Sequence, residues 1–573
     1  MASTRMTLMG TRHMISAGHY LAAHAGFEIL EAGGNAVDAG VAAGVAIGVL
    51  QTDKVNFGGV APQIIYTAKT RKVHCIDGLG VWPKAITPDY FMKYHGGKIP
   101  PGVERCVVPA APDAWITALA YFGTMSFGEV ASAAIRFARE GFPMHPMMAE
   151  FIKENRAVYQ RWPSSGKVFL PGGRVPEVGE VFVQSDLGRT LRYLADEEKK
   201  VARRKGRRAG LKAARDAFYK GDIARAVTKF IAKEGGPMRY EDFAEFGVKF
   251  EPTVCTRFDG IELHVCGPWS QGPVLPMALN ILKGYDLKGL GHNTPEYIHV
   301  LTEALKLAFA DRHHHFGDPR FIQVPIKGLT SDRYAQHRRS LISMEKAWPG
   351  MPPPGDPDAL AQLKHRCVPA PQPEDAPGPG DTSYVCVVDR KGNAFSATPS
   401  DGSDKTPIIS DVGILCSGRG TQSWADPAHP CSVAPGKRPR LTPNPALAFK
   451  NGRVYMPFGT PGGDVQCQAM LQVFLNINVF GMDVQSAVEA PRFSTYSFPG
   501  SFEPHPYYPG RLYLESRINR EVGNELAGRG HKVYWWDDST WLAGSVCAIV
   551  ADHKRGVLHG GADPRRPAYV VGW

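Results

Sequence analysis

Apolar residues recur along the chain with the periods of both helices and strands. Over 19–29 they return every three or four positions, which predicts an amphipathic helix that ends at the glycines 33–34. The next stretch, 36–50, is rich in Ala, Val and Gly on every side, so we expect a helix that is buried all round. Short apolar runs at 63–66 and 73–77 predict two paired strands.

Both patterns continue through the rest of the chain. Further helices are predicted at 113–121, 127–140, 297–312 and 466–477, and further strands at 261–266, 446–449, 454–457, 545–551 and 556–558. Strand hairpins combined with buried helices indicate sheets that are covered by helices. The sequence therefore predicts an α+β layered fold.

One Pro- and Gly-rich stretch, 349–381, interrupts these patterns. Proline and glycine dominate both its beginning at 349–355 and its end at 377–381. Such a composition predicts a flexible linker that is extended, exposed and accessible to proteases. It divides the chain into residues 1–381 and a strand-rich region, 382–573.

The residues directly after this linker predict a buried β-hairpin over 382–400, with its turn at 390–393. The first strand begins at a threonine, Thr382. Antiparallel pairing about position 391 sets Ser400 opposite Thr382, because both lie nine residues from it, and a bulge would move this pairing by one residue. A strand that starts at Thr382 after an exposed linker suggests a precursor that is cut between Asp381 and Thr382.

Such a cut would give Thr382 a free α-amino group beside its own hydroxyl. An α-amine has a pKa near 8, so a useful fraction is neutral at pH 7 and can accept the hydroxyl proton. The oxyanion of an acyl-transfer reaction needs N–H donors, which a turn at Gly462 and Gly463 before a helix would supply. Taken singly, each of these features is more often purely structural.

Composition and charge narrow the functional classes. The 573 residues are 43% hydrophobic and 21% charged, which is typical of a globular protein. The net charge is +11, and part of it lies in a basic run between Lys199 and Lys220. No aromatic residue interleaves this run between Lys199 and Arg215, as base stacking would need. We therefore favour a solvated helix face over a nucleic-acid or anionic-surface patch, and expect no nucleic-acid partner.

Metal, cofactor and membrane signals are weak. None of the ten cysteines forms a CxxC pair, and the consecutive histidines 313–315 lack the i, i+4 spacing of zinc-binding helices. There is no GxGxxG or Walker loop, so we predict neither a metal nor a cofactor. The first sixteen residues lack the apolar core of a secretory signal, and the run 39–50 is too short to cross a bilayer. We expect a cytoplasmic protein without a membrane partner.

Several separated segments together resemble the γ-glutamyltranspeptidase family of N-terminal nucleophile hydrolases. They follow the family's order over nearly the whole chain, at 33–39, 108–112, 303–312, 382–393, 436–439, 460–463, 489–493 and 561–565. The resemblance implies a four-layer αββα sandwich and autocatalytic cleavage before Thr382. The products 1–381 and 382–573 would stay associated as large and small subunits of one composite domain, and a dimer of such heterodimers is left open.

The same resemblance assigns roles to residues. It implies that Thr382 is the nucleophile, that Ser400 takes the position of a second threonine, and that Gly462 and Gly463 form the oxyanion hole. No cofactor is implied, and the expected substrate is a small-molecule amide.

The departures from the family concern the substrate pocket. Leu79 stands where the family has the arginine that binds the glutamyl α-carboxylate, and a leucine cannot make a bidentate carboxylate contact. The other departing positions are Gly402 for an asparagine, Gln422 for an aspartate, and Leu441 with Thr442 for paired serines. Arg419 and Arg440, near the same loops, are candidates for binding an acidic substrate, although arginines there are more often exposed or ion-paired.

Three hypotheses follow. The first is a self-processing amidohydrolase that cleaves a non-γ-glutamyl amide through an acyl-enzyme. The second is a γ-glutamyltransferase or glutathione hydrolase with a rearranged pocket, which activity on γ-glutamyl-p-nitroanilide would separate from the first. The third is an uncut, non-catalytic homologue that acts as a binding protein, which a chain left intact at Thr382 would favour.

Overall fold

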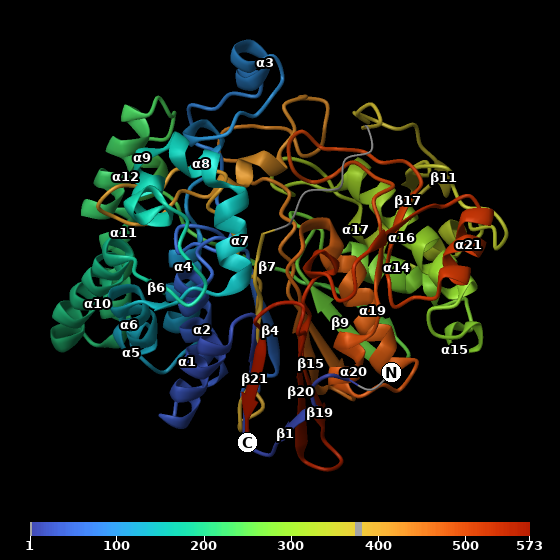
Figure 1. Ribbon diagram of the computed structural model, residues 1–573, viewed down its shortest axis with the longest axis horizontal. Coiled ribbons are helices and arrows are strands. Elements are labelled where there is room, and N and C mark those ends of the chain that lie inside the picture. The colour runs from blue at the N-terminus through green and yellow to red at the C-terminus, as the bar shows by residue number, and fades with distance from the viewer. Residues whose placement is uncertain (1–2, 373–380) are drawn as a thin grey trace.

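Two antiparallel sheets lie face to face at the centre of the molecule, and helices cover their outer faces (Figure 1). This is a computed structural model, and it describes residues 3–372 and 381–573. The layers run helix, sheet, sheet, helix, so the predicted αββα sandwich is confirmed.

Each sheet draws its strands from both ends of the chain. The first contains, in spatial order, β1 (Leu8–Gly10), β20 (Val557–Ala562), β19 (Cys547–Asp552), β15 (Arg453–Gly459), β14 (Ala446–Lys450), β9 (Ile261–Val265) and β8 (Val254–Phe258). The second contains β21 (Tyr569–Gly572), β2 (Met14–Ala17), β12 (Val385–Val388), β13 (Ala394–Ala397), β3 (Gln63–Thr67), β4 (Lys72–Ile76) and β7 (Phe250–Glu251).

The helices form two groups. Those on the side of the second sheet are α1 (Tyr20–Glu31), α2 (Ala36–Leu50), α4 (Ala111–Phe122), α5 (Phe127–Val130), α6 (Ser132–Glu140), α10 (Ser185–Lys205) and α11 (Arg207–Tyr219). Those on the side of the first sheet are α14 (Val274–Leu282), α16 (Pro295–His315), α19 (Gln466–Asn478) and α20 (Val484–Glu489). A separate apolar cluster that includes Tyr384 and Ile549 fills the space between the sheets.

Shorter elements complete the described chain. The helices are α3 (Tyr90–His95), α7 (Pro146–Glu154), α8 (Arg156–Arg161), α9 (Pro163–Phe169), α12 (Asp222–Lys233), α13 (Tyr240–Ala244), α15 (Leu287–Leu290), α17 (Ile326–Leu329), α18 (Asp332–Arg339) and α21 (Arg520–Gly528). Small sheets use β5 (Phe142–Pro143), β6 (Val181–Phe182), β10 (Gly355–Asp356), β11 (Ala361–Gln362), β16 (Phe493–Thr495), β17 (Arg511–Glu515) and β18 (Lys532–Trp536). Two 3₁₀ turns, η3 (Gly418–Gln422) and η4 (Gly463–Val465), matter for the site below.

Helix α2 is buried along its whole length, as its all-round apolar sequence predicts. Asn35 caps its N-terminus by accepting from the backbone N–H groups of Val37 and Asp38, and the Asp38 carboxylate accepts from the Asn35 N–H in return. Glycine is needed in the middle of this helix, because a Cβ at Gly40 would lie 2.1 Å from the ring of Phe395 on β13. The helix can therefore lie close against the sheet.

The central hairpin has the predicted register but a later start. Val385 pairs with Ala397 and Val388 with Ala394, so the pairing is centred on position 391. The strand itself begins at Val385 rather than at Thr382, because Thr382 has φ +100° and is not extended. The backbone N–H of Ser383 still donates to the Pro399 carbonyl at 3.0 Å, which carries the alignment back to Thr382.

The prediction of an exposed linker over 349–381 is wrong for its first part. Met351 is 7% exposed, and its N–H donates to the Tyr507 hydroxyl at 2.9 Å. Gly355 is also buried, and its N–H donates to the Asp311 carboxylate at 2.8 Å. The prolines of this part are packed against the rest of the protein, and a proline-rich composition is compatible with such packing as well as with an exposed linker. Residues 373–380 of the predicted linker lie outside the described part of the chain.

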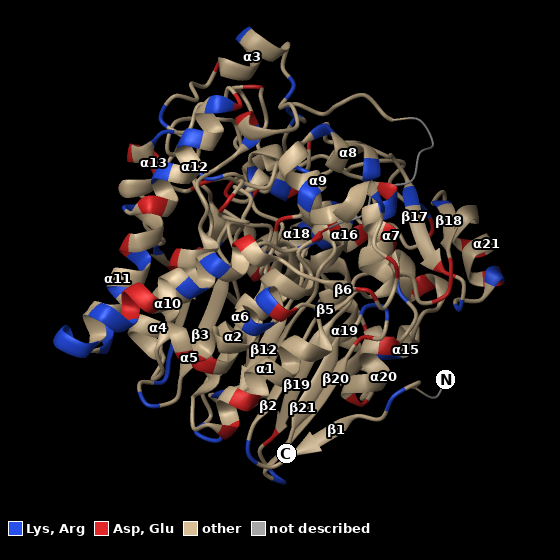
Figure 2. Ribbon diagram, turned by 60° about the vertical axis from the view of Figure 1, so that its left-hand side comes forward, with Lys and Arg blue, Asp and Glu red and all other residues tan. Residues whose placement is uncertain are grey.

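The basic run forms the free end of a helical hairpin. Helices α10 and α11 pack against each other, and Lys and Arg residues are concentrated at the end of the ribbon where the two helices join (Figure 2). Lys200 and Lys212 pair with acidic residues on their own helices, and Arg207 donates to the backbone carbonyls of Leu119 and Met125. This arrangement agrees with a solvated helix face. In the described residues, no helix has the length and apolar character that a bilayer crossing requires.

The fit between α2 and β13 gives a stability prediction. Gly40→Ala should destabilise the protein by about 1–3 kcal/mol, because the added methyl group forces the Phe395 ring to move in a packed core. The control is Gly528→Ala at the end of α21, where a Cβ meets nothing within 4 Å. We expect this control to be neutral or slightly stabilising. Thermal denaturation of both variants checks this, and equal melting temperatures would contradict the close packing.

Candidate active site

Thr382 and Ser400 form a buried pair of hydroxyl groups. The distance from Thr382 Oγ1 to Ser400 Oγ is 2.6 Å, and both residues are fully buried. Ser400 is fixed by a two-way backbone pairing with Val60 beside β3. The hydroxyl contact predicted from the hairpin register is therefore present, while the catalytic roles of the two residues stay predictions.

The backbone at Thr382 is held in an unfavourable conformation. Its φ of +100° lies in a region that glycine adopts easily and a β-branched residue does not. Its N–H donates to the Lys54 carbonyl at 3.1 Å, and its own carbonyl accepts from Arg566 Nη1 at 3.0 Å. Strain of this kind costs roughly 1–3 kcal/mol and persists only where surrounding contacts enforce it. Here it lies at the bond that the sequence predicts to be cut.

The Asp381 side chain occupies the space next to both hydroxyls. Its Oδ1 accepts from Thr382 Oγ1 at 3.2 Å and from Ser400 Oγ at 3.3 Å. Its Oδ2 accepts from Arg419 Nη2 at 2.6 Å and from the Gly402 N–H at 3.0 Å. Burial alone would raise the pKa of Asp381, but the Arg419 guanidinium outweighs burial and holds that pKa below its usual value. The carboxylate is therefore ionised at neutral pH.

Arg419 reaches this centre from η3. Its Nη2 also donates to Ser400 Oγ, and its Nε lies 3.3 Å from Asp401 Oδ1. The side chain is 1% exposed, so it is ion-paired as expected for an arginine, but within the active centre rather than at the surface. The Gly402 N–H donates to the same Asp381 carboxylate. The sequence had marked Gly402 only as a position where the family has an asparagine.

A cavity of about 440 Å³ opens beside Asp381. Gly462 and Gly463 line it, together with Lys54, Arg105 and a largely aromatic wall formed by Phe151, Tyr496, Phe498, Phe502 and Tyr508. Asp381 lines this cavity, whereas Thr382 and Ser400 are fully buried and do not line it.

The glycine turn predicted to form the oxyanion hole lines the same cavity. Gly462 and Gly463 have φ of +122° and +57°, which favour glycine at both positions. Gln271 Nε2 donates to the Gly463 carbonyl at 2.8 Å and fixes the turn. The turn η4 begins at Gly463, and the first N–H groups of a helix have no partner within it.

Lys54 is a functional candidate that the sequence did not reveal. It is 2% exposed, and its Nζ lies 3.3 Å from the centre of the Phe151 ring and 4.8 Å from that of Trp541. Among the described residues Nζ has no hydrogen-bond partner. Burial lowers the pKa of Lys54 to about 8. In the sequence, the feature that could have indicated Lys54 is the charged pair Asp53-Lys54 directly after the buried apolar helix 36–50.

Five other predicted substrate-binding residues do not line this cavity. Leu79 packs in the apolar cluster between the sheets with Trp269 and Leu441. Gln422 donates to the Thr442 hydroxyl at 2.8 Å, and both are fully buried. Arg440 is 1% exposed and donates to the Arg312 carbonyl at 3.3 Å. All five positions are buried in the structure, so the prediction that they bind the substrate finds no support in the lining of this cavity.

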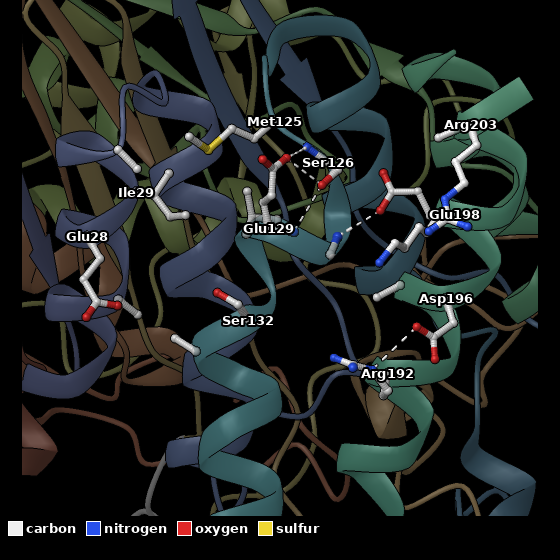
Figure 3. A pocket seen from close by; sticks show the side chains of 18 residues that line it. Glu28, Ile29, Met125, Ser126, Glu129, Ser132, Arg192, Asp196, Glu198 and Arg203 are labelled. Atoms are coloured by element: carbon white, nitrogen blue, oxygen red, sulfur yellow. Dashed lines mark hydrogen bonds and ion pairs between the residues drawn. The ribbon is translucent and has the colours of Figure 1, made fainter. Parts of the chain in front are cut away.

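Other candidate sites lie away from Thr382. A pocket of about 850 Å³ lies between α1, α6 and α10, and several of its charged lining residues have partners, as Arg192 has Asp196 and Glu198 has the N–H of Gly128 (Figure 3). It shares no lining residue with the cavity beside Asp381.

The histidine run and the possible metal ligands are engaged elsewhere. His313 and His315 contact backbone carbonyls at 3.0 and 2.9 Å. His299, Glu303 and His531 lie close enough together to hold a cation, but Lys306 Nζ already lies 2.7 Å from Glu303 Oε1 and supplies positive charge there.

The depressed pKa of Lys54 gives a pH-dependent prediction. A shift from 10.5 to about 8 corresponds to on the order of 3 kcal/mol. The folded state disfavours the charged amine, so this penalty is full below pH 8 and disappears as the pH rises to 10.5. The stability of a Thr382→Ala chain should therefore rise relative to Lys54→Met/Thr382→Ala between pH 8 and pH 10, measured by urea unfolding. A difference that does not change with pH would contradict the buried amine.

Comparison with known proteins agrees with this geometry. The family model described as gamma-glutamyltranspeptidase matches residues 22–573. The chain is 31% identical over 573 residues to the glutathione hydrolase-like YwrD proenzyme of Bacillus subtilis (strain 168), with 99% of each chain covered. It is 33% identical over 568 residues to the acylase ACY 1 proenzyme of Pseudomonas sp. (strain SE83), which covers 96% of this chain and 92% of the relative.

A solved structure supports the same conclusion. The cephalosporin acylase from Bacillus halodurans superposes with a TM-score of 0.86 at 29% identity, covering 100% of this chain and 98% of the other. Together with the matched family model, these relatives show that the chain is an enzyme of the γ-glutamyltranspeptidase family, with the fold of the N-terminal nucleophile hydrolases.

Proposed function

We propose that this protein is a self-processing N-terminal threonine amidohydrolase that cleaves the amide bond of a small, non-γ-glutamyl substrate. One observation carries the proposal: a strained Thr382 backbone, with the Thr382 hydroxyl in contact with a second hydroxyl and an ionised carboxylate. This arrangement favours a nucleophile poised against the preceding peptide bond. The proenzyme names of the two relatives are consistent with it.

Self-processing needs a base other than the α-amine, which is still part of the peptide bond. The Asp381 carboxylate is ionised and lies 3.2 Å from Thr382 Oγ1, so it can accept the hydroxyl proton. Thr382 Oγ1 then attacks the Asp381 carbonyl carbon, the C–N bond breaks, and the nitrogen takes up the proton. Water hydrolyses the resulting ester to give the Asp381 α-carboxylate and a free Thr382 hydroxyl and amine.

The two fragments would stay together after the cut. In the second sheet, β12 pairs with β2 and β13 pairs with β3, so strands of the small subunit lie between strands of the large one. Separating them would expose the centre of the sheet. We therefore propose a heterodimer of 1–381 and 382–573.

Turnover would then use the new amine as the base. The Lys54 carbonyl, which accepts from the Thr382 N–H in the uncut chain, would orient this amine. The amine takes the Thr382 hydroxyl proton as Oγ1 attacks the substrate carbonyl, and passes it to the leaving amine as the acyl-enzyme forms. Gly462 and Gly463 would stabilise the oxyanion, and water would release the acid.

The pocket favours an amide other than a γ-glutamyl one. Lys54 lines the cavity and Arg419 donates to Ser400 beside Thr382, so both cations lie near the proposed reaction centre, whereas Leu79 lies outside the cavity. Like charges repel, so these residues disfavour the α-ammonium group that every γ-glutamyl substrate carries. A γ-glutamyltransferase or glutathione hydrolase remains the alternative, because a relative bears a glutathione hydrolase-like name.

Processing is tested by following the purified precursor by intact mass and N-terminal sequencing. The wild type should yield a small fragment that begins Thr-Ser-Tyr-Val-Cys, and Thr382→Ala should stay uncut. Asp381→Asn removes the proposed base and should slow the cut on the order of 10²-fold. Asp404→Asn is the matched control, because Asp404 lies on the same cavity wall but pairs with Lys405, and its effect should be much smaller. A wild-type chain that never matures would support the non-catalytic hypothesis instead.

Substrate preference is tested with two p-nitroanilides that differ by one amino group. γ-Glutamyl-p-nitroanilide carries an α-ammonium, and glutaryl-p-nitroanilide has the same chain without it. We expect kcat/KM of the mature enzyme to be at least about tenfold higher for the glutaryl compound, equivalent to about 1.4 kcal/mol. Thr382→Ala provides the blank. Equal or better use of the γ-glutamyl compound would favour the glutathione hydrolase alternative.

A further inference from the structure

Two neighbouring strands at one edge of the first sheet bring together three side chains of the kinds that bind metals. Cys255 on β8 pairs directly with His264 on β9, and Glu262 lies two residues before His264, so all three point to the same face of the hairpin. One ligand atom from each side chain lies within 4.8 Å of the others. The cross-strand pairing therefore places a thiol, a carboxylate and an imidazole around one point.

The sheet fixes the direction of these side chains. On β9 (Ile261–Val265) the first, third and fifth residues are buried in the apolar cluster that includes α14, which turns Glu262 and His264 to the other face. The edge of the His264 ring packs against Phe449 on β14, with 5.4 Å between the ring centres, and the His264 side chain is 13% exposed. The candidate ligands therefore stand on packed strands rather than on loops.

The imidazole of His264 is held in the way that metal-binding histidines are held. Its Nδ1 lies 2.9 Å from the Thr253 hydroxyl, and its Nε2 lies 3.0 Å from Glu262 Oε1. Metal-binding histidines use one ring nitrogen for the ion and fix the ring by a hydrogen bond from the other. Thr253 can supply that second contact, which leaves Nε2 available on the side of Glu262.

The Glu262 carboxylate can offer one of its oxygens to an ion. Arg257 donates to Oε2 from Nε and Nη2, at 3.2 and 3.0 Å, whereas Oε1 faces His264. The Arg257 side chain is 79% exposed, so it can move into solvent when a second cation arrives. This differs from the buried histidine group described above, where the Lys306 ammonium contacts Glu303 and is itself fully buried. An added cation is therefore tolerated better at the edge of the sheet.

We propose that Cys255, Glu262 and His264 bind one divalent cation of the thiophilic class that includes zinc, with a fourth coordination position open to water. Thiolate and imidazole ligands favour zinc, whereas magnesium and calcium prefer oxygen ligands. Ligand atoms on one tetrahedral zinc ion lie about 3–4 Å apart, so small side-chain rotations complete the site. The Cys255 thiol releases its proton to solvent as the sulfur–metal bond forms, and no electron is transferred.

This site goes beyond the proposed amidohydrolase function, because none of its three ligands lines the cavity beside Asp381. Strand β8 is the last strand of the first sheet, so an ion bound to β8 and β9 together cross-links the edge of that sheet. The sequence gave no sign of it. The expectation of no metal relied on CxxC pairs and helical spacings, which a site built across a β-hairpin does not show.

The site is tested by titrating the full chain with Co²⁺ alone, after dialysis against a chelator. Co²⁺ bound to a thiolate gives a strong charge-transfer band in the near ultraviolet. We expect this band to saturate at one equivalent per chain and to disappear when Zn²⁺ is added. Cys255→Ser should lose the band. Cys367→Ser is the matched control and should keep it, because Cys367 is also partly exposed and its sulfur lies 3.1 Å from an Asp426 carboxylate oxygen.

Zinc affinity separates the ligands from their neighbours, in variants that circular dichroism shows to be folded. His264→Gln should weaken Zn²⁺ binding on the order of 10²-fold, and Thr253→Val, which removes only the contact that orients the ring, about tenfold. Zn²⁺ should raise the melting temperature of the wild type and leave that of Cys255→Ser unchanged. A wild type without the Co²⁺ charge-transfer band, or a band that survives in Cys255→Ser, would overturn the site. The buried histidine group contains no cysteine and cannot produce this band.

Discussion

The pairing of β12 with β13 at the middle of the second sheet is the constraint on which the site depends. It is centred on position 391 and continues through the Ser383 N–H to Pro399, which brings Thr382 Oγ1 within 2.6 Å of Ser400 Oγ. Because β2 and β3 pair on either side, the hairpin cannot slip without breaking ladders to both neighbours. The hydroxyl pair is thus positioned by a buried hairpin at the centre of the fold. The charged group that contacts it, the Arg419 guanidinium, reaches it from η3.

Backbone strain at Thr382 is opposed by the ion pair that the preceding residue, Asp381, forms with Arg419. A positive φ at a β-branched residue costs roughly 1–3 kcal/mol, which the peptide bond to Asp381 helps to maintain. The buried ion pair between Asp381 and Arg419 holds the preceding residue in place, and breaking such a pair by removing one partner costs about 3–5 kcal/mol. In the uncut chain, the ion pair between Asp381 and Arg419 therefore holds the backbone at Thr382 in its strained conformation. Cutting the bond would free the Thr382 backbone from this strain, while Arg419 would keep its contacts with Ser400 and Asp401.

Local patterns predicted the elements better than they predicted the pocket. Helix α2 has the predicted bounds, 36–50, and the hairpin register followed from the turn alone, because both depend on residues close in sequence. The roles of Lys54 and Arg419 depend on contacts across hundreds of residues, so no spacing in the sequence reveals them. Leu79 illustrates the opposite error: its place in a family motif suggested the pocket, but a leucine is more stable in the apolar space between the sheets, and that is where it lies. Prolines near 351–355 suggested an exposed linker, although the same residues pack well against the protein body.

An aspartate immediately before the nucleophile combines two properties that a neutral residue would lack. Its carboxylate is a base within reach of Thr382 Oγ1 when no free amine exists, and its charge satisfies Arg419 until the chain is cut. The first property would make the precursor competent to react, and the second holds the carboxylate in contact with the Thr382 hydroxyl. The two properties are coupled, because the Arg419 guanidinium that lowers the pKa of Asp381 also binds its carboxylate beside Thr382.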